Sequence, residues 1–104
     1  MFVCQWHLDV VFGRQGDAVK VFNAWSAEML ASSEFRRAKS HRLLCGHVGP
    51  SASHLIHEHL FETLADFEAA LQGMAQPQFK PFPEALAPVI VPGSQHWEIY
   101  RTLS

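Results

Sequence analysis

The chain has 104 residues, a formal net charge of −2, and 48% hydrophobic, 12% aromatic and 17% charged residues. This length fits one domain, so we expect residues 1–104 to form a single unit. The 8 basic and 10 acidic residues nearly balance and form no long basic run, which argues against nucleic acid as a partner. No apolar stretch reaches the ~18 residues of a membrane span and no signal peptide is evident, so we expect a cytoplasmic protein without membrane contact.

The first half of the chain predicts a strand, a helix and a hairpin. Apolar side chains occupy alternate positions over residues 2–12, as in a strand with one buried face. Asp17 can cap a helix whose apolar residues recur at helical spacing to about Ser32. Two further strands are predicted over residues 41–48 and 54–62, separated by a turn that contains Gly49 and Pro50.

The second half predicts a helix, an irregular segment and a last strand. Thr63 and Asp66 form a capping-box pattern, and apolar residues then mark one helical face over residues 64–74. The prolines within residues 76–88 allow only a loop, with at most one short turn at residues 83–86. Alternation returns over residues 95–103 and predicts the final strand.

The order strand, helix, strand, strand, helix, strand predicts an α+β, ferredoxin-like βαββαβ fold. In this topology the four strands form an antiparallel sheet in the order 4-1-3-2, with both helices on one face. The other face must meet water or a partner. Apolar side chains on that face, namely Val3, Val11, Ile56 and Leu60, favour a partner, so we expect a homodimer.

The element order over the whole chain resembles the dimeric α+β barrel superfamily. Its branches include the antibiotic-biosynthesis-monooxygenase-like, NIPSNAP-like and stress-responsive A/B-barrel proteins. The strand-to-helix junction over residues 58–67 and the closing segment over residues 93–101 carry the same resemblance. The resemblance implies that two such sheets pair into one barrel within a homodimer.

The resemblance does not carry an active site or a cofactor to this chain. Haem-degrading members use an Asn on the first strand, a Trp on the third strand and a His near the end of the second helix, and this sequence has none of them. The polyketide-cyclase-like A/B barrels use a first-strand His, which His7 matches, but their Tyr and second His are absent. We therefore expect neither haem nor another cofactor.

Polar side chains gather on the sheet face that lies away from the predicted helices. Strands 1, 3 and 4 are neighbours, so His7 can lie between Glu58 and Glu98, with Tyr100 nearby. A carboxylate raises the pKa of a neighbouring imidazole, unless burial outweighs the attraction, and thereby suits it to general-base catalysis. We predict His7, Glu58, Glu98 and Tyr100 as catalytic residues. A hydrogen-bond network without a catalytic role explains the same residues.

Histidine is frequent, with 7 residues in 104, and two arrangements could ligate a metal. Two carboxylates around His7 form one ligand set, and His57 and His59, roughly 6.6 Å apart on one strand face, form another. Hydrogen bonding or core packing explains both sets, so no metal site is predicted. Three histidines at strand ends near the predicted turn are expected in solvent: His41, His47 and His54.

The helix side of the predicted sheet offers a second candidate site, a pocket for an aromatic compound. Its predicted substrate-binding residues are Trp6, Trp25, His57, His59, Phe79 and Phe82. Phe79 and Phe82 belong to the proline-rich segment, which can cover the pocket, and we expect them at its rim or in a dimer contact. Core packing is the alternative explanation for the other aromatic residues.

Two functions from different classes remain open. The first is a cofactor-independent monooxygenase, isomerase or cyclase that acts on a small hydrophobic or aromatic compound, with His7 as general base. The second is a non-catalytic module that binds such a ligand or only assembles. The fold is compatible with both classes.

Overall fold

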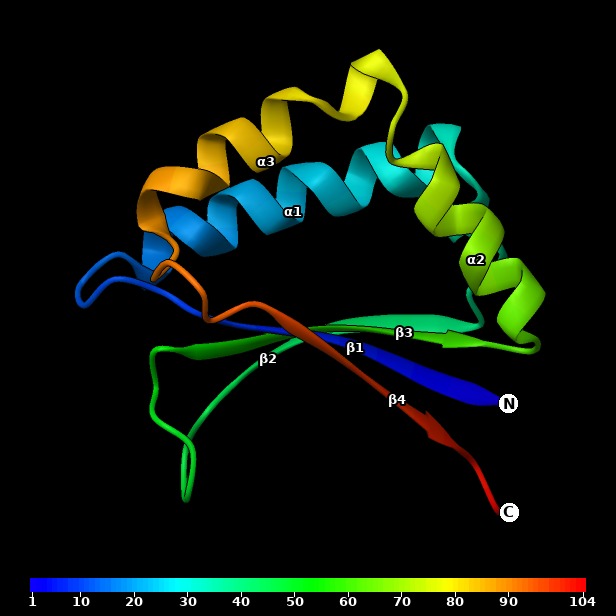
Figure 1. Ribbon diagram of the computed structural model, residues 1–104, viewed down its shortest axis with the longest axis horizontal. Coiled ribbons are helices and arrows are strands. Elements are labelled where there is room, and N and C mark those ends of the chain that lie inside the picture. Colours follow the sequence, from blue (N-terminus) through cyan, green and yellow to red (C-terminus); the bar gives the residue numbers. More distant parts are fainter.

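A four-stranded antiparallel sheet carries the helices of the chain on one face, and the computed structural model describes all 104 residues (Figure 1). The strands are β1 (Phe2–Asp9), β2 (Ser40–Cys45), β3 (His54–Phe61) and β4 (His96–Arg101). The α-helices are α1 (Gln15–Ser32), α2 (Leu64–Gly73) and α3 (Pro81–Leu86), and short 3-10 helices cover Glu34–Arg37, Pro77–Phe79 and Ala87–Val89. The sheet order β2-β3-β1-β4 confirms the predicted α+β, ferredoxin-like topology.

Strand β1 lies in the interior of the sheet and pairs with both β3 and β4. Gln5 lies opposite Glu58 on one side and Glu98 on the other. Trp6, the next residue, lies opposite His57 and Trp97. This register makes strands 1, 3 and 4 neighbours, as the sequence predicts.

The hydrophobic core fills the space between the sheet and the helical layer. On β1, Cys4 and Leu8 are fully buried on the side that faces the helices, which confirms the predicted alternation. The buried residues of α1 recur at the predicted helical spacing: Ala18, Phe22, Trp25 and Met29. Complete burial of a side chain such as Phe22 stabilises the fold by about 1.5–3 kcal/mol.

Two predictions near the start of the chain are wrong. Strand β1 ends at Asp9, earlier than predicted, because the chain beyond it pairs with residues 89–91: the Val91 N–H donates to the Asp9 carbonyl and the Val11 N–H to the Val89 carbonyl (2.8 Å each). Asp17 does not cap α1. It lies within the first turn of the helix, where Arg14 donates a hydrogen bond to its carboxylate (2.6 Å).

Helix α2 begins as the capping pattern predicts. The Thr63 hydroxyl oxygen accepts a hydrogen bond from the Asp66 N–H (3.1 Å), which satisfies one of the free amides at the helix start. Phe67 and Ala70 are its buried residues and attach the helix to the core. Neither α2 nor any other helix combines the length and the apolar character that a bilayer crossing requires.

The proline-rich segment is helical rather than a loop, which corrects the prediction. Prolines occupy the first turns of its three short helices. A backbone amide in the first turn has no acceptor within the helix, so a proline there costs no hydrogen bond. Phe79 is fully buried in the core, so it is neither a pocket rim residue nor a dimer contact. Phe82 is half-buried and stacks on Trp25, with ring centroids 5.9 Å apart.

Replacing Phe79 by alanine should lower the free energy of unfolding by about 3–5 kcal/mol, because the change leaves a cavity in the core. Phe12→Ala is the matched control, since Phe12 is 93% exposed, and it should change stability by less than ~0.5 kcal/mol. Urea denaturation of the two variants measures the difference. Equal stability of both variants would place the proline-rich segment outside the core. If Phe79→Ala does not fold, Phe79→Leu should show a smaller loss of the same sign.

Candidate functional site

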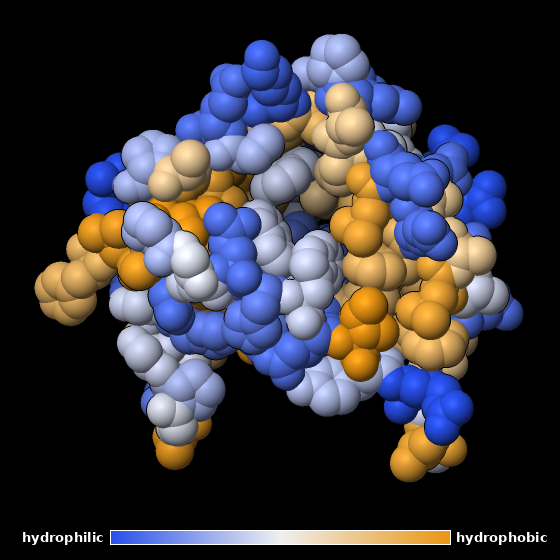
Figure 2. All heavy atoms as spheres, viewed as in Figure 1, coloured by the Kyte–Doolittle hydropathy of each residue, from blue (hydrophilic) through white to orange (hydrophobic).

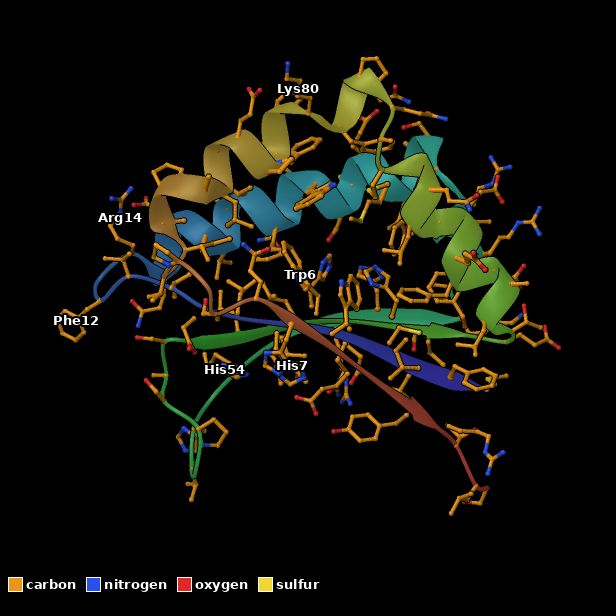
Figure 3. The ribbon with its side chains drawn as sticks, in the orientation of Figure 1. Trp6, His7, Phe12, Arg14, His54 and Lys80 are labelled. Atoms are coloured by element: carbon orange, nitrogen blue, oxygen red, sulfur yellow. The ribbon has the colours of Figure 1, made fainter.

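Trp6 and His7, two consecutive residues of β1, lie in different environments. Trp6 points toward the helices and His7 points away from them, so the two side chains lie on opposite sides of the sheet (Figure 3). The side that faces the helices is called the helix side here, and the other side is called the open face. Each side carries one group of the predicted site residues.

His7 lies in a chain of polar contacts on the open face. Its Nδ1 atom lies 2.8 Å from Nε2 of His54, whose Nδ1 lies 2.8 Å from Oδ1 of Asp9. On the other side of the ring, Nε2 of His7 lies 2.9 Å from Oε1 of Gln5 and 3.3 Å from Oε2 of Glu98. His54 is therefore not a free solvent-exposed residue, contrary to the expectation, because the strand register places it opposite Asp9.

Glu98 joins two further residues of β4 to this cluster. Tyr100 donates a hydrogen bond to Oε1 of Glu98, and Nε2 of His96 lies 2.9 Å from Oε2. These two hydrogen bonds hold the pKa of the Glu98 carboxyl below its usual value. The imidazole of His96 also stacks on that of His7, with centroids 4.7 Å apart. Through Glu98 the structure brings together three of the four predicted catalytic residues.

Glu58 does not lie beside His7, which corrects the predicted arrangement. Gln5 stands between them and donates to Oε1 of Glu58 (2.8 Å), while Arg42 donates to Oε2 (2.5 Å). Burial alone raises the pKa of the Glu58 carboxyl, but the hydrogen bonds from Arg42 and Gln5 outweigh it and lower the pKa overall. Glu58 therefore forms an ion pair with Arg42 of β2 and does not contact the imidazole of His7.

The pKa of His7 is lowered rather than raised, contrary to the expectation. Burial of the imidazole is the largest cause and outweighs the attraction of Glu98, while His96 and His54 lower the pKa further. Only 7% of His7 is exposed. The imidazole is consequently uncharged at neutral pH.

A cavity of about 400 Å³ lies against this cluster on the open face. Its lining residues are His7, Asp9, Pro50, Ser51, His54, His96 and Glu98. Because the lining has no large apolar side chain, the cavity suits an ion or a small polar group better than an apolar compound.

A second cavity, of about 260 Å³, lies on the helix side. The space-filling view shows the molecule hollowed between the sheet and the helical layer (Figure 2). The residues that line this helix-side pocket are Trp6, Trp25, Met29, Phe35, His57, His59, Leu71, Met74, Gln95 and Trp97.

Four of the six predicted substrate-binding residues line this pocket: Trp6, Trp25, His57 and His59. Phe79 and Phe82 do not, because the first lies in the core and the second stacks on Trp25. Sequence reasoning missed Met29, Leu71 and Met74 as lining residues. Their helical spacing predicts the buried face of each helix. The spacing does not distinguish a side chain packed in the core from one that lines a cavity.

The two histidines of the pocket are buried and uncharged. The pKa of His57 is lowered to about 4 and that of His59 to about 3, with burial as the largest cause of both shifts. His41 of β2 contributes to both shifts, and His57 contributes to that of His59. His57 also lies within hydrogen-bond distance of the Ser26 hydroxyl of α1 (Nε2 to Oγ, 3.1 Å). At neutral pH these imidazoles can exchange hydrogen bonds with a ligand without carrying charge.

Comparison with known proteins identifies the fold. No protein-family model matches the sequence, and no curated protein matches it either. An uncharacterized NIPSNAP domain protein from Burkholderia xenovorans superposes with a TM-score of 0.78 at 12% identity, covering 100% of this chain and 96% of that one. A proposed antibiotic biosynthesis monooxygenase from Caulobacter crescentus has a TM-score of 0.75 at 14% identity, covering 99% and 90%.

A third solved structure carries a described activity. SnoaB, a cofactor-independent oxygenase from Streptomyces nogalater, has a TM-score of 0.69 at 19% identity, and the match covers 99% of this chain and 94% of SnoaB. These likenesses confirm the predicted ferredoxin-like βαββαβ fold. At such low identities they establish the fold alone.

The buried histidines should make the protein sensitive to acid. A histidine whose folded pKa lies below its unfolded value of ~6.5 binds its proton mainly in the unfolded state, so stability falls as the pH drops below ~6.5. Between pH 7 and pH 4, His59 should lower the free energy of unfolding by roughly 3 kcal/mol, and His59→Gln should abolish this contribution. His47→Gln, at an exposed position, is the matched control and should keep the wild-type pH dependence.

Urea denaturation at several pH values measures this difference. Three titratable groups lie beside His59: His57 on the same strand, His41 on β2 and Cys4 on β1. The Cys4 thiol stays protonated, because burial raises its pKa to about 11. An unchanged pH dependence in His59→Gln would show that His59 titrates alike in the folded and unfolded states.

Proposed function

We propose, from a fold shared with antibiotic biosynthesis monooxygenase and NIPSNAP structures, that this chain binds a small uncharged aromatic compound in the helix-side pocket. One observation carries the proposal. All 3 tryptophans of the chain line this one cavity, together with two uncharged imidazoles.

The tryptophans offer stacking surfaces at fixed angles. Trp6 meets Trp25 edge to face, with centroids 5.9 Å apart, and lies nearly parallel to Trp97 at 6.2 Å. Aromatic rings prefer edge-to-face and offset-stacked neighbours. A planar ring that enters the cavity can therefore contact indole faces or edges on more than one side.

The size and polarity of the pocket narrow the class of ligand. A volume of about 260 Å³ lies just below the usual range for ligand pockets, so the ligand is a compound of one or two rings. Besides the indole N–H groups, the polar groups of the lining are His57, His59 and Gln95, none of which is charged at neutral pH. A hydroxyl or carbonyl on the ring can bond to them, whereas an ionised group finds no counter-charge there.

Binding is better supported than catalysis at this pocket. A monooxygenase, isomerase or cyclase that uses no cofactor needs a base near the ring of its substrate. His57 and His59, with pKa values of about 4 and 3, are weak bases. They suit the orientation of a hydroxyl or carbonyl group.

A second candidate function is general-base catalysis by His7 on the open face. The contact chain from Asp9 through His54 to His7 favours it, because such a chain orients the imidazole. Glu98 and Tyr100 complete that proposed set. Because His7 and the pocket lie on opposite sides of the sheet, a ligand of the pocket does not contact His7.

We also propose that the chain forms a homodimer through its open face. Proteins of this fold are typically dimeric. Ile56 and Leu60, on the open-face side of β3, are only half-buried in the single chain, and covering them would remove apolar surface from water. The partner in this proposal is a second copy of the same sheet face.

Ligand binding can be tested by calorimetry with a panel of phenols, naphthols and matching carboxylates. Leu71→Trp should fill part of the cavity, because Leu71 lines it, and should weaken binding of a naphthol at least ~10-fold. Leu64→Trp is the matched control on the same helix, since Leu64 is 46% exposed and lies outside the lining. It should bind like the wild type.

The outcomes of this experiment separate the candidates. Stronger binding of phenols and naphthols than of their carboxylates, lost in Leu71→Trp, supports the pocket. Binding that survives Leu71→Trp and disappears in His7→Gln would move the site to the open face. The absence of binding by every compound would contradict the proposal of an aromatic ligand.

Replacing Leu60 by glutamate should convert the dimer into a monomer, because the charge would be buried in the interface. Leu64→Glu, on the helix side, is the matched control and should leave the dimer intact. Sedimentation velocity at micromolar concentration measures both. A monomeric wild type, or a dimer of Leu60→Glu with wild-type stability, would rule out this interface.

A further inference from the structure

Three potential metal ligands converge on the open face, away from the helix-side pocket. His7, His96 and Glu98 each offer one ligand atom, and the three atoms lie within 4.8 Å of one another. His7 and His96 are directly paired across β1 and β4, and Glu98 follows two residues later on the same side of β4. The antiparallel ladder therefore holds the three side chains in one place.

We propose that His7, His96 and Glu98 bind one zinc ion. Two imidazoles and one carboxylate form a ligand set that occurs at zinc sites in proteins that keep a fourth position for water or substrate. Hard cations such as Mg²⁺ and Ca²⁺ favour ligand sets made only of oxygen. The two imidazole nitrogens here point to a borderline ion instead.

Two of the ligand-atom distances come close to the spacing of tetrahedral coordination. Zinc bonds of about 2.0–2.1 Å place two ligand atoms of a tetrahedron roughly 3.3 Å apart. The atoms Nε2 of His7 and Oε2 of Glu98 are separated by 3.3 Å, and Nε2 of His96 lies 2.9 Å from the same oxygen. The first distance matches this spacing, and the second must lengthen by about 0.4 Å when an ion binds.

A second layer of contacts orients the most buried ligand. When zinc occupies Nε2 of His7, the proton of that ring lies on Nδ1 and can be donated to Nε2 of His54, 2.8 Å away. His54 then donates its own Nδ1–H to Asp9, again over 2.8 Å. Metal-bound imidazoles commonly have an outer partner of this kind, which fixes the tautomer and the ring orientation.

Charge also favours a dication at this place. Glu98 and Asp9 supply two carboxylates, and no lysine or arginine lines the cavity. One zinc ion would balance both carboxylates. It would displace Oε1 of Gln5, which lies 2.9 Å from Nε2 of His7, while the Gln5 amide keeps its bond to Glu58. The cavity of about 400 Å³ next to the cluster leaves room for water at the fourth position.

The test uses tag-free full-length protein that has been treated with a chelator and dialysed. Calorimetric titration with zinc chloride should give one ion per chain, and the melting temperature should rise with zinc. Cobalt(II) should give the intense visible bands of a tetrahedral site. His96→Ala should abolish tight binding without disturbing the fold, because the His96 side chain is 51% exposed.

Two further variants separate a built site from adventitious binding by surface histidines. His47→Ala removes an exposed histidine outside the cluster and should bind zinc like the wild type. Asp9→Asn keeps all three ligands but weakens the outer contact to His54, and should lower zinc affinity ~10–100-fold. Failure of the wild type to bind zinc, or equal affinity in the wild type and His96→Ala, would overturn the proposal.

Discussion

The alternation of side chains along β1 is the constraint on which both candidate sites depend. Successive residues of a strand point to opposite faces of the sheet, so Trp6 and His7 cannot share a cavity. The register then assigns their neighbours: Trp6 meets His57 and Trp97 on the helix side, whereas His7 is paired with His96 on the open face. A slip of one residue would exchange the two faces and place the polar cluster under the helices.

The open face is organised by polar contacts more than by apolar packing. Glu58 is only 7% exposed, yet it remains a carboxylate because Arg42 and Gln5 bond to it. A buried polar network is destabilising when one of its members loses its partner. A second chain that covers this face must therefore leave these bonds in place and gain its stability from side chains such as Ile56 and Leu60.

The fold could be predicted from the sequence because strand and helix periods identify buried faces without knowledge of any contact. The helices of the proline-rich segment could not be predicted, because the effect of a proline depends on its position. A proline breaks a helix when it lies in the interior but favours a helix when it lies in the first turn. The alternation of side chains placed Glu58 on the correct face of the sheet. Alternation does not show which neighbouring side chain bonds to Glu58, and in the structure this is Arg42. His54 was missed because a residue beside a predicted turn gives no sign that Asp9 lies opposite.

The separation of the two faces is tested most directly by two-dimensional NMR of one labelled sample, titrated first with a naphthol and then with zinc. The naphthol should shift the indole N–H signals of Trp6, Trp25 and Trp97 and leave the imidazole signals of His7 and His96 unchanged. Zinc should shift the imidazole signals of His7 and His96 and leave the indole N–H signals unchanged. Movement of both groups of signals on addition of either ligand would contradict two independent sites on opposite sides of one sheet.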